Sequence, residues 1–277
     1  MHIPELFKDT YAAWSDDNAS RMAAALAYYA AFALAPLLII VIEIGAAVLG
    51  GSGHHHVVED AIFKHLEPSI GADGVKALGS IVSATFQQQQ RGRFGAAIGW
   101  IIFVVAASGF FAAIESTLDS VWHVTPAKQS LRGAVLARCK SVAIIAAISV
   151  VVLLSVVATT GFAALSGAAA AMLDAVISFV VVSVCFAALF KYLPKTSIDW
   201  SDVRIGAVIS GALFMIGQLL IGLYLGRASV TSAYGAAGSF VALLLWLYYS
   251  AQIFLFGAEF TKTYAQRIGS KSRSRGG

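Results

Sequence analysis

Charged residues are scarce in this chain of 277 amino acids. Asp, Glu, Lys and Arg together make up 12% of it, whereas 58% is hydrophobic. A soluble domain usually carries about 25% charged residues. So few charges cannot keep so large an apolar fraction in water, which excludes an ordinary soluble domain.

The sequence also lacks the G-x-x-x-x-G-K-[ST] motif that binds nucleotide phosphates, so we predict no ATP-driven activity of its own.

Cysteine is nearly absent as well. Cys139 and Cys185 lie in or beside apolar runs, and two such residues form neither a disulfide framework nor a metal quartet. The triplet His54, His55 and His56 leaves a zinc site open, although three consecutive imidazoles on a helix cannot all face one ion. We therefore assign no metal and no cofactor from the sequence.

Long apolar runs dominate what is present. A helix needs about 20 apolar residues to cross a bilayer. Such runs lie at 22–49, 94–114, 139–164, 170–192, 203–226 and 237–261. We predict an all-α polytopic membrane protein in which residues 1–265 form one domain of six transmembrane helices. Residues 266–277 are expected to be a short, basic, disordered tail.

Two segments outside these runs have helical periodicity. Residues 3–14 place apolar side chains on one face of a helix, which is typical of an interfacial helix on a membrane surface. The long loop at 54–90 has one amphipathic pattern before Pro68 and a second after Gly74. We therefore predict an N-terminal interfacial helix and two short amphipathic helices in the first outer loop.

The distribution of positive charge predicts the orientation. With both termini in the cytoplasm, fourteen of the nineteen Lys and Arg residues lie on the inner side and only five on the outer side. Positively charged segments resist translocation, so this bias favours cytoplasmic termini. The basic end of the chain is expected to lie near anionic membrane lipids, and no nucleic-acid partner is predicted.

The first span contains one carboxylate. Tyr29, Pro36 and Glu43 recur at intervals of seven and share a helix face, and the proline can open the backbone midway. At a rise of about 1.5 Å per residue, Glu43 lies about 33 Å from Arg21, near the outer boundary of the membrane. Glu43 therefore either reaches the outer headgroups or belongs to a pathway through the bundle.

Acidic groups also occur near the inner ends of two other spans. Glu115 and Asp119 share one face, where they either hold a proton between them or pair with Arg132, Arg138 or the basic tail. Glu259 shares a face with Tyr248 and Gln252, and Gln218 is positioned to hydrogen-bond with this seam. The candidate pathway residues are Tyr28, Tyr29, Pro36, Glu43, Glu115, Asp119, Gln218, Tyr248, Gln252 and Glu259.

Three stretches carry a family resemblance. "AAALAYYAAFALAPLL", "STLDSVWHV" and "YGAAGSFVALLLWLYYSAQIFLFGAEFTKTYA" are similar to the YihY/BrkB family of bacterial inner-membrane proteins, over about residues 5–265. The resemblance implies six spans with both ends inside. Members long carried a ribonuclease BN label, but a metallo-nuclease needs a water-facing cluster of metal ligands. The only histidine cluster lies in the outer loop, so we predict that the chain is not an enzyme.

The resemblance suggests an inner-membrane transporter or a protein that translocates a lipid or another envelope component. The alternative is a structural or accessory envelope protein whose polar residues only join helices. Membrane lipids are the expected partners, and a homo-oligomer stays open.

Overall fold

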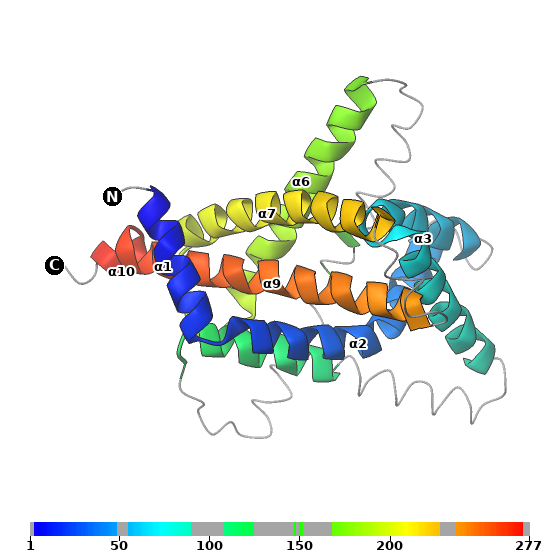
Figure 1. The fold of residues 1–277 in the computed structure, drawn as a ribbon, viewed down its shortest axis with the longest axis horizontal. Helices are drawn as coiled ribbons and strands as arrows, with labels where there is room; N and C mark the ends of the chain where they lie inside the picture. Colours follow the sequence, from blue (N-terminus) through cyan, green and yellow to red (C-terminus); the bar gives the residue numbers. More distant parts are fainter. Residues whose placement is uncertain are drawn as a thin grey trace.

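The computed structural model describes residues 3–48, 55–89, 108–124, 147, 150–151, 168–227 and 237–273. Within these ranges the chain forms helices and no strands, which confirms the all-α fold (Figure 1). The helices are α1 (Ile3–Asp16), α2 (Ala19–Val48), α3 (His55–Gln89), α6 (Ala168–Tyr192), α7 (Trp200–Arg227), α9 (Gly238–Arg267) and α10 (Ser270–Arg273). One further helix covers residues 108–121.

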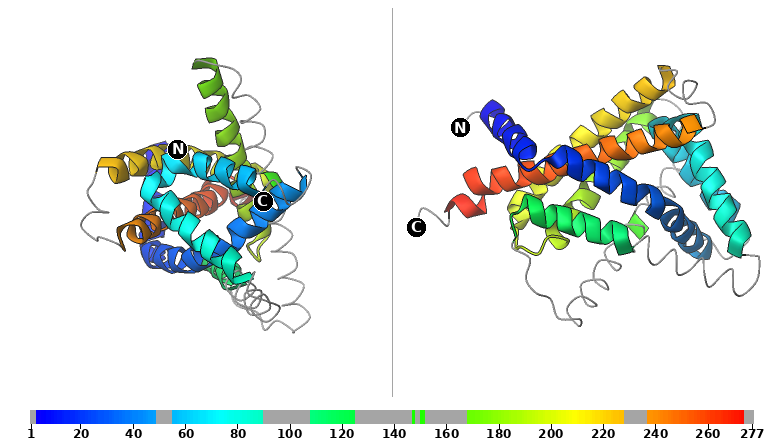
Figure 2. Two further views of the ribbon diagram at one scale, coloured as in Figure 1. Left: turned by 90° about the vertical axis from the view of Figure 1, so that its right-hand side faces the viewer. Right: turned by 60° about the horizontal axis from the view of Figure 1, so that its bottom comes forward.

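Helix α9 is the centre of the bundle. It contacts α1, α2, α3, α7 and α10, and both termini lie at the end where α9 finishes, opposite α3 (Figure 1). Two apolar clusters follow its length. Phe190, Leu118 and Leu255 belong to the cluster nearer the termini, and Ile42 and Leu243 belong to the cluster beside α3. Further views show α6 extending away from the other helices at its N-terminal end (Figure 2).

Glycines allow close packing of α7 on its neighbours. A Cβ atom at Gly206 would overlap the Thr261 side chain of α9, and a Cβ at Gly211 would overlap Ser183 of α6. Small residues at such crossings let helix backbones approach in membrane proteins. These contacts bring the start of α7 against the last turns of α9, where the charged groups described below lie.

Three described helices are long and apolar enough to cross a membrane: Ala171–Tyr192, Trp200–Ile221 and Gly238–Ser272. A fourth results if Ala19–Leu34 and Leu37–Ala47 count as one span with a bend of 49°. Pro36 lies in the break between them and lacks the N–H that an unbroken helix needs. The predicted spans at 94–114 and 139–164 lie largely outside the described residues, so the number six stays a prediction.

Helix α3 consists of two helices across a kink, as predicted for the first outer loop. Gly71 divides them with a φ of 73° and a ψ of 166°, a conformation that glycine adopts readily. Val58 and Ile62 of the first helix and Leu78 of the second are buried in the apolar cluster beside α2 and α9. Their burial confirms the amphipathic pattern.

Helix α1 confirms the helix predicted at residues 3–14 and continues to Asp16. Leu6 is buried, and the Phe7 ring lies 5.4 Å from the Phe260 ring of α9. Tyr11 faces outward and is 62% exposed. One face of α1 therefore packs on the bundle, while its position on the membrane surface stays a prediction.

The C-terminal segment differs from the expected disordered tail. Helix α9 continues to Arg267, and α10 follows at Ser270–Arg273. The Ser270 hydroxyl donates a hydrogen bond of 2.6 Å to Oδ2 of Asp202, and its backbone N–H also contacts this carboxylate. Asp202 lies in the first turn of α7 and is almost fully buried, so it needs these donors. Residues 266–273 are therefore part of the packed structure, whereas 274–277 lie outside the described residues.

Candidate functional site

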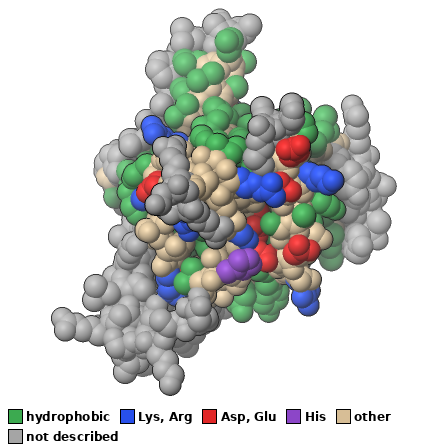
Figure 3. All heavy atoms as spheres, turned by 90° about the vertical axis from the view of Figure 1, so that its left-hand side faces the viewer, with side chains coloured by type: hydrophobic (Ala, Val, Ile, Leu, Met, Phe, Trp, Pro, Cys, Tyr) green, Lys and Arg blue, Asp and Glu red, His purple; other side chains and the backbone are tan. Residues whose placement is uncertain are grey.

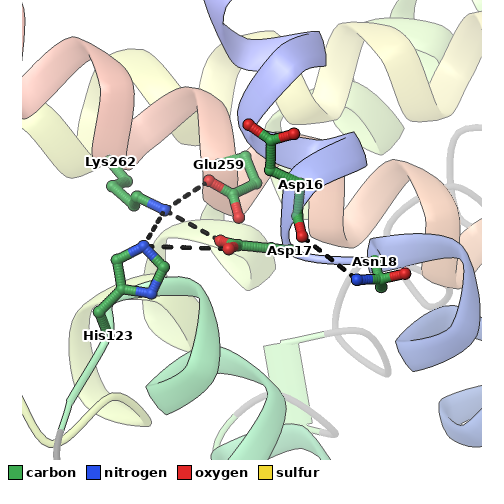
Figure 4. A network of polar contacts seen from close by, with 6 residues as sticks. All are labelled: Asp16, Asp17, Asn18, His123, Glu259 and Lys262. Atoms are coloured by element: carbon green, nitrogen blue, oxygen red, sulfur yellow. Dashed lines mark hydrogen bonds and ion pairs between the residues drawn. The ribbon is translucent and has the colours of Figure 1, made fainter.

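A cluster of ionisable side chains lies at the end of the bundle that carries the termini, where Glu259 and Lys262 are buried and the His123 side chain is 64% exposed. Asp17 comes from the turn between α1 and α2, His123 follows the helix at 108–121, and Glu259 and Lys262 belong to α9 (Figure 4). The Lys262 ammonium lies 3.1 Å from Oδ2 of Asp17 and 3.0 Å from Oε2 of Glu259. It also lies 3.4 Å from Nε2 of His123. Lys262 thus connects three segments that are distant in the sequence.

The two turns beside the cluster have unusual backbone conformations. Asn18 has a φ of 53° and His123 a φ of 51°, in the left-handed region that glycine favours. His123 occupies the position after the helix at 108–121, where Val124 N–H bonds to Asp119 C=O and His123 N–H bonds to Ser120 C=O. This is a Schellman ending with histidine in the usual glycine position. Backbone strain of this kind often occurs at functional sites.

Glu259 is the most deeply enclosed member of the cluster, because its side chain is 0% exposed. Oε2 of Glu259 lies within ion-pair distance of the Lys262 ammonium. Neither carboxyl oxygen of Glu259, however, forms a hydrogen bond of good geometry with a described residue. An ionised carboxylate taken out of water costs several kcal/mol unless charges and donors compensate for it. Lys262 is the cation that offsets both Glu259 and Asp17.

Asp17 lies outside the candidate spans and keeps its charge. Burial acts to raise the pKa of Asp17, but its side-chain contacts with Glu259 and Lys262 and the positive charge of Lys262 lower it by more. The net effect holds the pKa of Asp17 below its usual value of 3.8. Asp17 is therefore ionised at neutral pH, and the cluster contains a permanent negative charge beside Lys262.

Glu115 and Asp119 form a second cluster around Lys195. The Lys195 ammonium lies 2.7 Å from Oε1 of Glu115 and 3.2 Å from Oδ2 of Asp119. The backbone N–H of Lys195 also donates a hydrogen bond to Oδ1 of Asp119. The hydrogen bond that the Lys195 ammonium donates to the Glu115 carboxylate is the main reason why the pKa of Lys195 is raised. The two acids share one helix face, as predicted. Their partner is this lysine of the α6–α7 turn, which was not expected, while Arg132 and Arg138 lie outside the described residues.

The remaining candidate residues lie in different parts of the bundle. Gln252 donates a hydrogen bond of 3.5 Å to the Ser20 hydroxyl of α2, and no described hydrogen bond joins it to Gln218. Tyr248 packs against both apolar clusters. Tyr28 and Tyr29 are exposed, with their rings 5.8 Å apart. The structure does not bring the ten candidates together at one point.

Glu43 lies at the opposite end from Glu259. Its side chain is 51% exposed, and Oε1 is 3.6 Å from Nδ1 of His55 at the start of α3. Among the described residues, no group of three or more His, Cys, Asp or Glu side chains is arranged to hold a metal ion. His54 lies outside these residues.

Sequence reasoning missed Asp17, His123, Lys195 and Lys262 as members of the two clusters. A signal existed for Lys262, since it follows Glu259 by three residues on one helix face. No local pattern joined Asp17 to Lys262, because they are 245 residues apart. Charged side chains gather over the end of the molecule that carries these clusters (Figure 3). There, Arg267 also pairs with Asp9 at 2.9 Å.

Comparisons with known proteins assign the chain to a family over nearly its whole length. The family model described as "Virulence factor BrkB" matches residues 10–276. The chain belongs to this family. The resemblance seen in the sequence is thereby confirmed. No solved structure matches the BrkB-family chain.

Several curated relatives are named UPF0761 membrane protein. The protein from Teredinibacter turnerae is 27% identical over 97% of the chain, and the one from Saccharophagus degradans is 25% identical over 99%. The protein from Alkalilimnicola ehrlichii is 28% identical over 94% of the chain. The chain spans 58–62% of the length of these relatives. It is a helical membrane protein, and the relatives' names state no activity.

Proposed function

We propose that this BrkB-family chain is a bacterial inner-membrane transporter, or a protein that translocates a lipid or another envelope component, and that it takes no energy from ATP by itself. One observation carries the proposal. Glu259 is fully buried in a candidate membrane span, beside Asp17, Lys262 and His123. Ionisable groups at such positions are costly and commonly belong to ion or substrate pathways.

The orientation that we propose has both termini in the cytoplasm. Helices α1 and α10 lie at the same end of the bundle, which supports termini on one side (Figure 1). Fourteen of nineteen Lys and Arg residues then face inward. Reporter fusions at Ser52 and after Arg227 test this arrangement, because a cytoplasmic reporter at either site contradicts it.

In this proposal Glu259 marks the cytoplasmic mouth of a pathway and Glu43 the opposite mouth. Gln252 and Tyr248 follow Glu259 along α9 toward the other end, on the face that the seven- and four-residue spacing defines. Gln252 supports a polar interior there, since its Oε1 is buried without a hydrogen-bond partner among the described residues. Glu115 and Asp119 lie near the same mouth, held by Lys195.

The second candidate function is a structural or accessory role without transport. The ion pairs themselves favour it, because each joins separate segments. Lys262 joins α9 to the α1–α2 turn, Lys195 joins the α6–α7 turn to the helix at 108–121, and Arg267 joins α9 to α1. Such pairs would hold the bundle together even if nothing moved through it. In either case we propose that the chain is not an enzyme.

The experiment that separates the two functions compares Glu259→Gln with Glu43→Gln in reconstituted liposomes. Lipid scrambling and solute uptake are followed, and a thermal melt of the same preparations measures folding. Glu259→Gln removes the charge and keeps the shape, and Lys262 retains Asp17 as a partner. We expect it to abolish proton- or cation-coupled activity at a nearly unchanged melting temperature. Glu43→Gln is the comparison variant at the opposite, exposed mouth and should have the milder effect, because water and headgroups can replace the contacts of that carboxylate.

The opposite pattern contradicts transport through this cluster. If Glu259→Gln melts much earlier but retains normal activity per folded molecule, Glu259 is a packing anchor. If neither the wild-type chain nor Glu43→Gln moves any probe, the structural role is favoured.

A further inference from the structure

Two cations that flank the α6–α7 turn each contact Trp200, Lys191 through the ring and Arg204 through the backbone carbonyl. Trp200 is the first residue of α7, and the Lys191 ammonium lies 5.5 Å from the centre of its ring. Arg204, one turn further along α7, donates from Nε to the Trp200 carbonyl at 3.3 Å. Lys191 also donates to the carbonyl of Ile198. Lys191 is thereby held beside the Trp200 indole, and Arg204 is tied to the backbone of the same residue.

Among the described residues, these two cations differ from their neighbours in having no acidic partner. Lys195, Lys262 and Arg267 each pair with one or more carboxylates. In the described parts of the chain, neither Lys191 nor Arg204 forms an ion pair.

The acids nearest in sequence do not change this. Asp202 is buried and bound to Ser270, and Asp199 is exposed without an ion pair to either cation. The turn therefore presents two positive charges that the described protein does not neutralise.

The position of the turn relative to the membrane indicates the ligand. One candidate span ends at Tyr192 and the next begins at Trp200, and the two rings meet edge to face with centroids 6.0 Å apart. Trp200 is 47% exposed and Tyr192 is 43% exposed. Tyr and Trp at the ends of membrane spans lie at the level of the lipid headgroups. Lys191 and Arg204 thus lie where phosphates of the bilayer are found.

We propose that Lys191 and Arg204 bind the phosphate of an anionic phospholipid, with Trp200 completing the site. The free N–H groups of the guanidinium and the ammonium donate to phosphate oxygens, a pairing in which arginine is especially effective. The exposed part of the indole packs against the glycerol and upper acyl region. The site requires only that the chain is a membrane protein and does not depend on transport.

Native mass spectrometry of the full chain in detergent, titrated with phosphatidylglycerol, tests the proposal. Each cation near an anionic lipid surface contributes enough attraction to change affinity about fivefold, so Lys191→Gln and Arg204→Gln should each weaken binding about fivefold. The double variant should weaken it about 25-fold if the two contributions add. Arg204→Lys keeps the charge and should retain most of the affinity.

Lys64→Gln on α3 is the matched control, since it removes one exposed positive charge at the other end of the molecule. Equal weakening by Lys64→Gln would show that the lipid responds only to net charge and would overturn the site. Unchanged binding to the double variant would also overturn it. Only folded monomers are scored, so a variant that unfolds in part still gives a value.

Two further binding measurements identify the ligand. Phosphatidylcholine, whose headgroup has no net charge, should bind the wild-type chain several-fold more weakly than phosphatidylglycerol does. Inorganic phosphate at the same concentration should not displace phosphatidylglycerol. Displacement by phosphate would assign the site to a free anion and would overturn the lipid proposal.

Discussion

The two ends of the bundle each contain a carboxylate beside a basic group, but in opposite surroundings. At the end with the termini, Glu259 and Asp17 share Lys262 inside the protein, and Glu259 is fully buried. At the other end, Glu43 lies 3.6 Å from His55 and half of its side chain is exposed. Similar pairs of residue types therefore have different energies, because water screens one pair and is excluded from the other.

The comparison shows that the depth of a charge matters more than its presence in an apolar run. Glu43 and Glu259 both interrupt long hydrophobic stretches, and from the sequence each is a candidate for a pathway. Only Glu259 is fully buried, in a cluster to which the α1–α2 turn, the end of the helix at 108–121 and α9 each contribute side chains (Figure 4). The variants below test whether substitutions at the buried end lower the stability of the protein more than substitutions at the exposed end do.

Lys262→Met should have the largest effect. It removes the cation that offsets Asp17 and Glu259 and leaves two carboxylates close together in the interior. Loss of one partner from a buried ion pair usually costs about 3–5 kcal/mol of unfolding free energy. Denaturant unfolding in detergent measures this, with Lys64→Met on the exposed surface of α3 as control. A loss below about 1 kcal/mol would place Lys262 in the same class as exposed ion pairs.

Ser270→Ala should have the next largest effect, at the same end. It removes the hydroxyl that donates a hydrogen bond of 2.6 Å to the buried Asp202 carboxylate. A hydrogen bond to a charged group contributes about 1.5–3 kcal/mol. Ser272→Ala, which removes a bond to the Gly269 carbonyl, is the control and should cost less. Equal melting temperatures for Ser270→Ala and the wild type would show that the segment after α9 adds no stability.

The acid sensitivity of the buried end should depend on Asp17. The pKa of Asp17 is lower in the folded protein than its usual value of 3.8. Its contribution to stability is therefore fully present above the unfolded pKa and is lost as the pH falls through the lower, folded pKa. Between about pH 5 and about pH 3, the wild type should lose more unfolding free energy than Asp17→Asn. Parallel losses in the two proteins would contradict this role.

Glu43→Gln should have the smallest effect on stability. Its pair with His55 is half exposed, and such pairs contribute about 1 kcal/mol or less. The melting temperature at neutral pH should stay close to that of the wild type. If Glu43→Gln destabilises the chain as much as Lys262→Met does, the contrast between the two ends is wrong.

Much of the local structure follows from the sequence. The amphipathic periodicity predicted α1 and both helices of α3, because an apolar face at helical spacing must be buried somewhere. Spacing of four residues correctly placed Glu115 and Asp119 on one face. The expectation of a disordered tail from residue 266 was not met, because composition alone did not show that Asp202 needs donors from Ser270.

Composition and charge by themselves determined that this is a helical membrane protein, because apolar runs with so few charges are stable only in lipid. Tertiary structure decided which charged groups meet. Lys195 joins Asp119 across 76 residues, and Lys262 joins Asp17 across 245. Such pairs depend on how the helices pack, and local periodicity carries no information about a partner that lies on another helix. For the same reason only the fold separates Glu259, which is fully buried, from Glu43, which remains in contact with solvent.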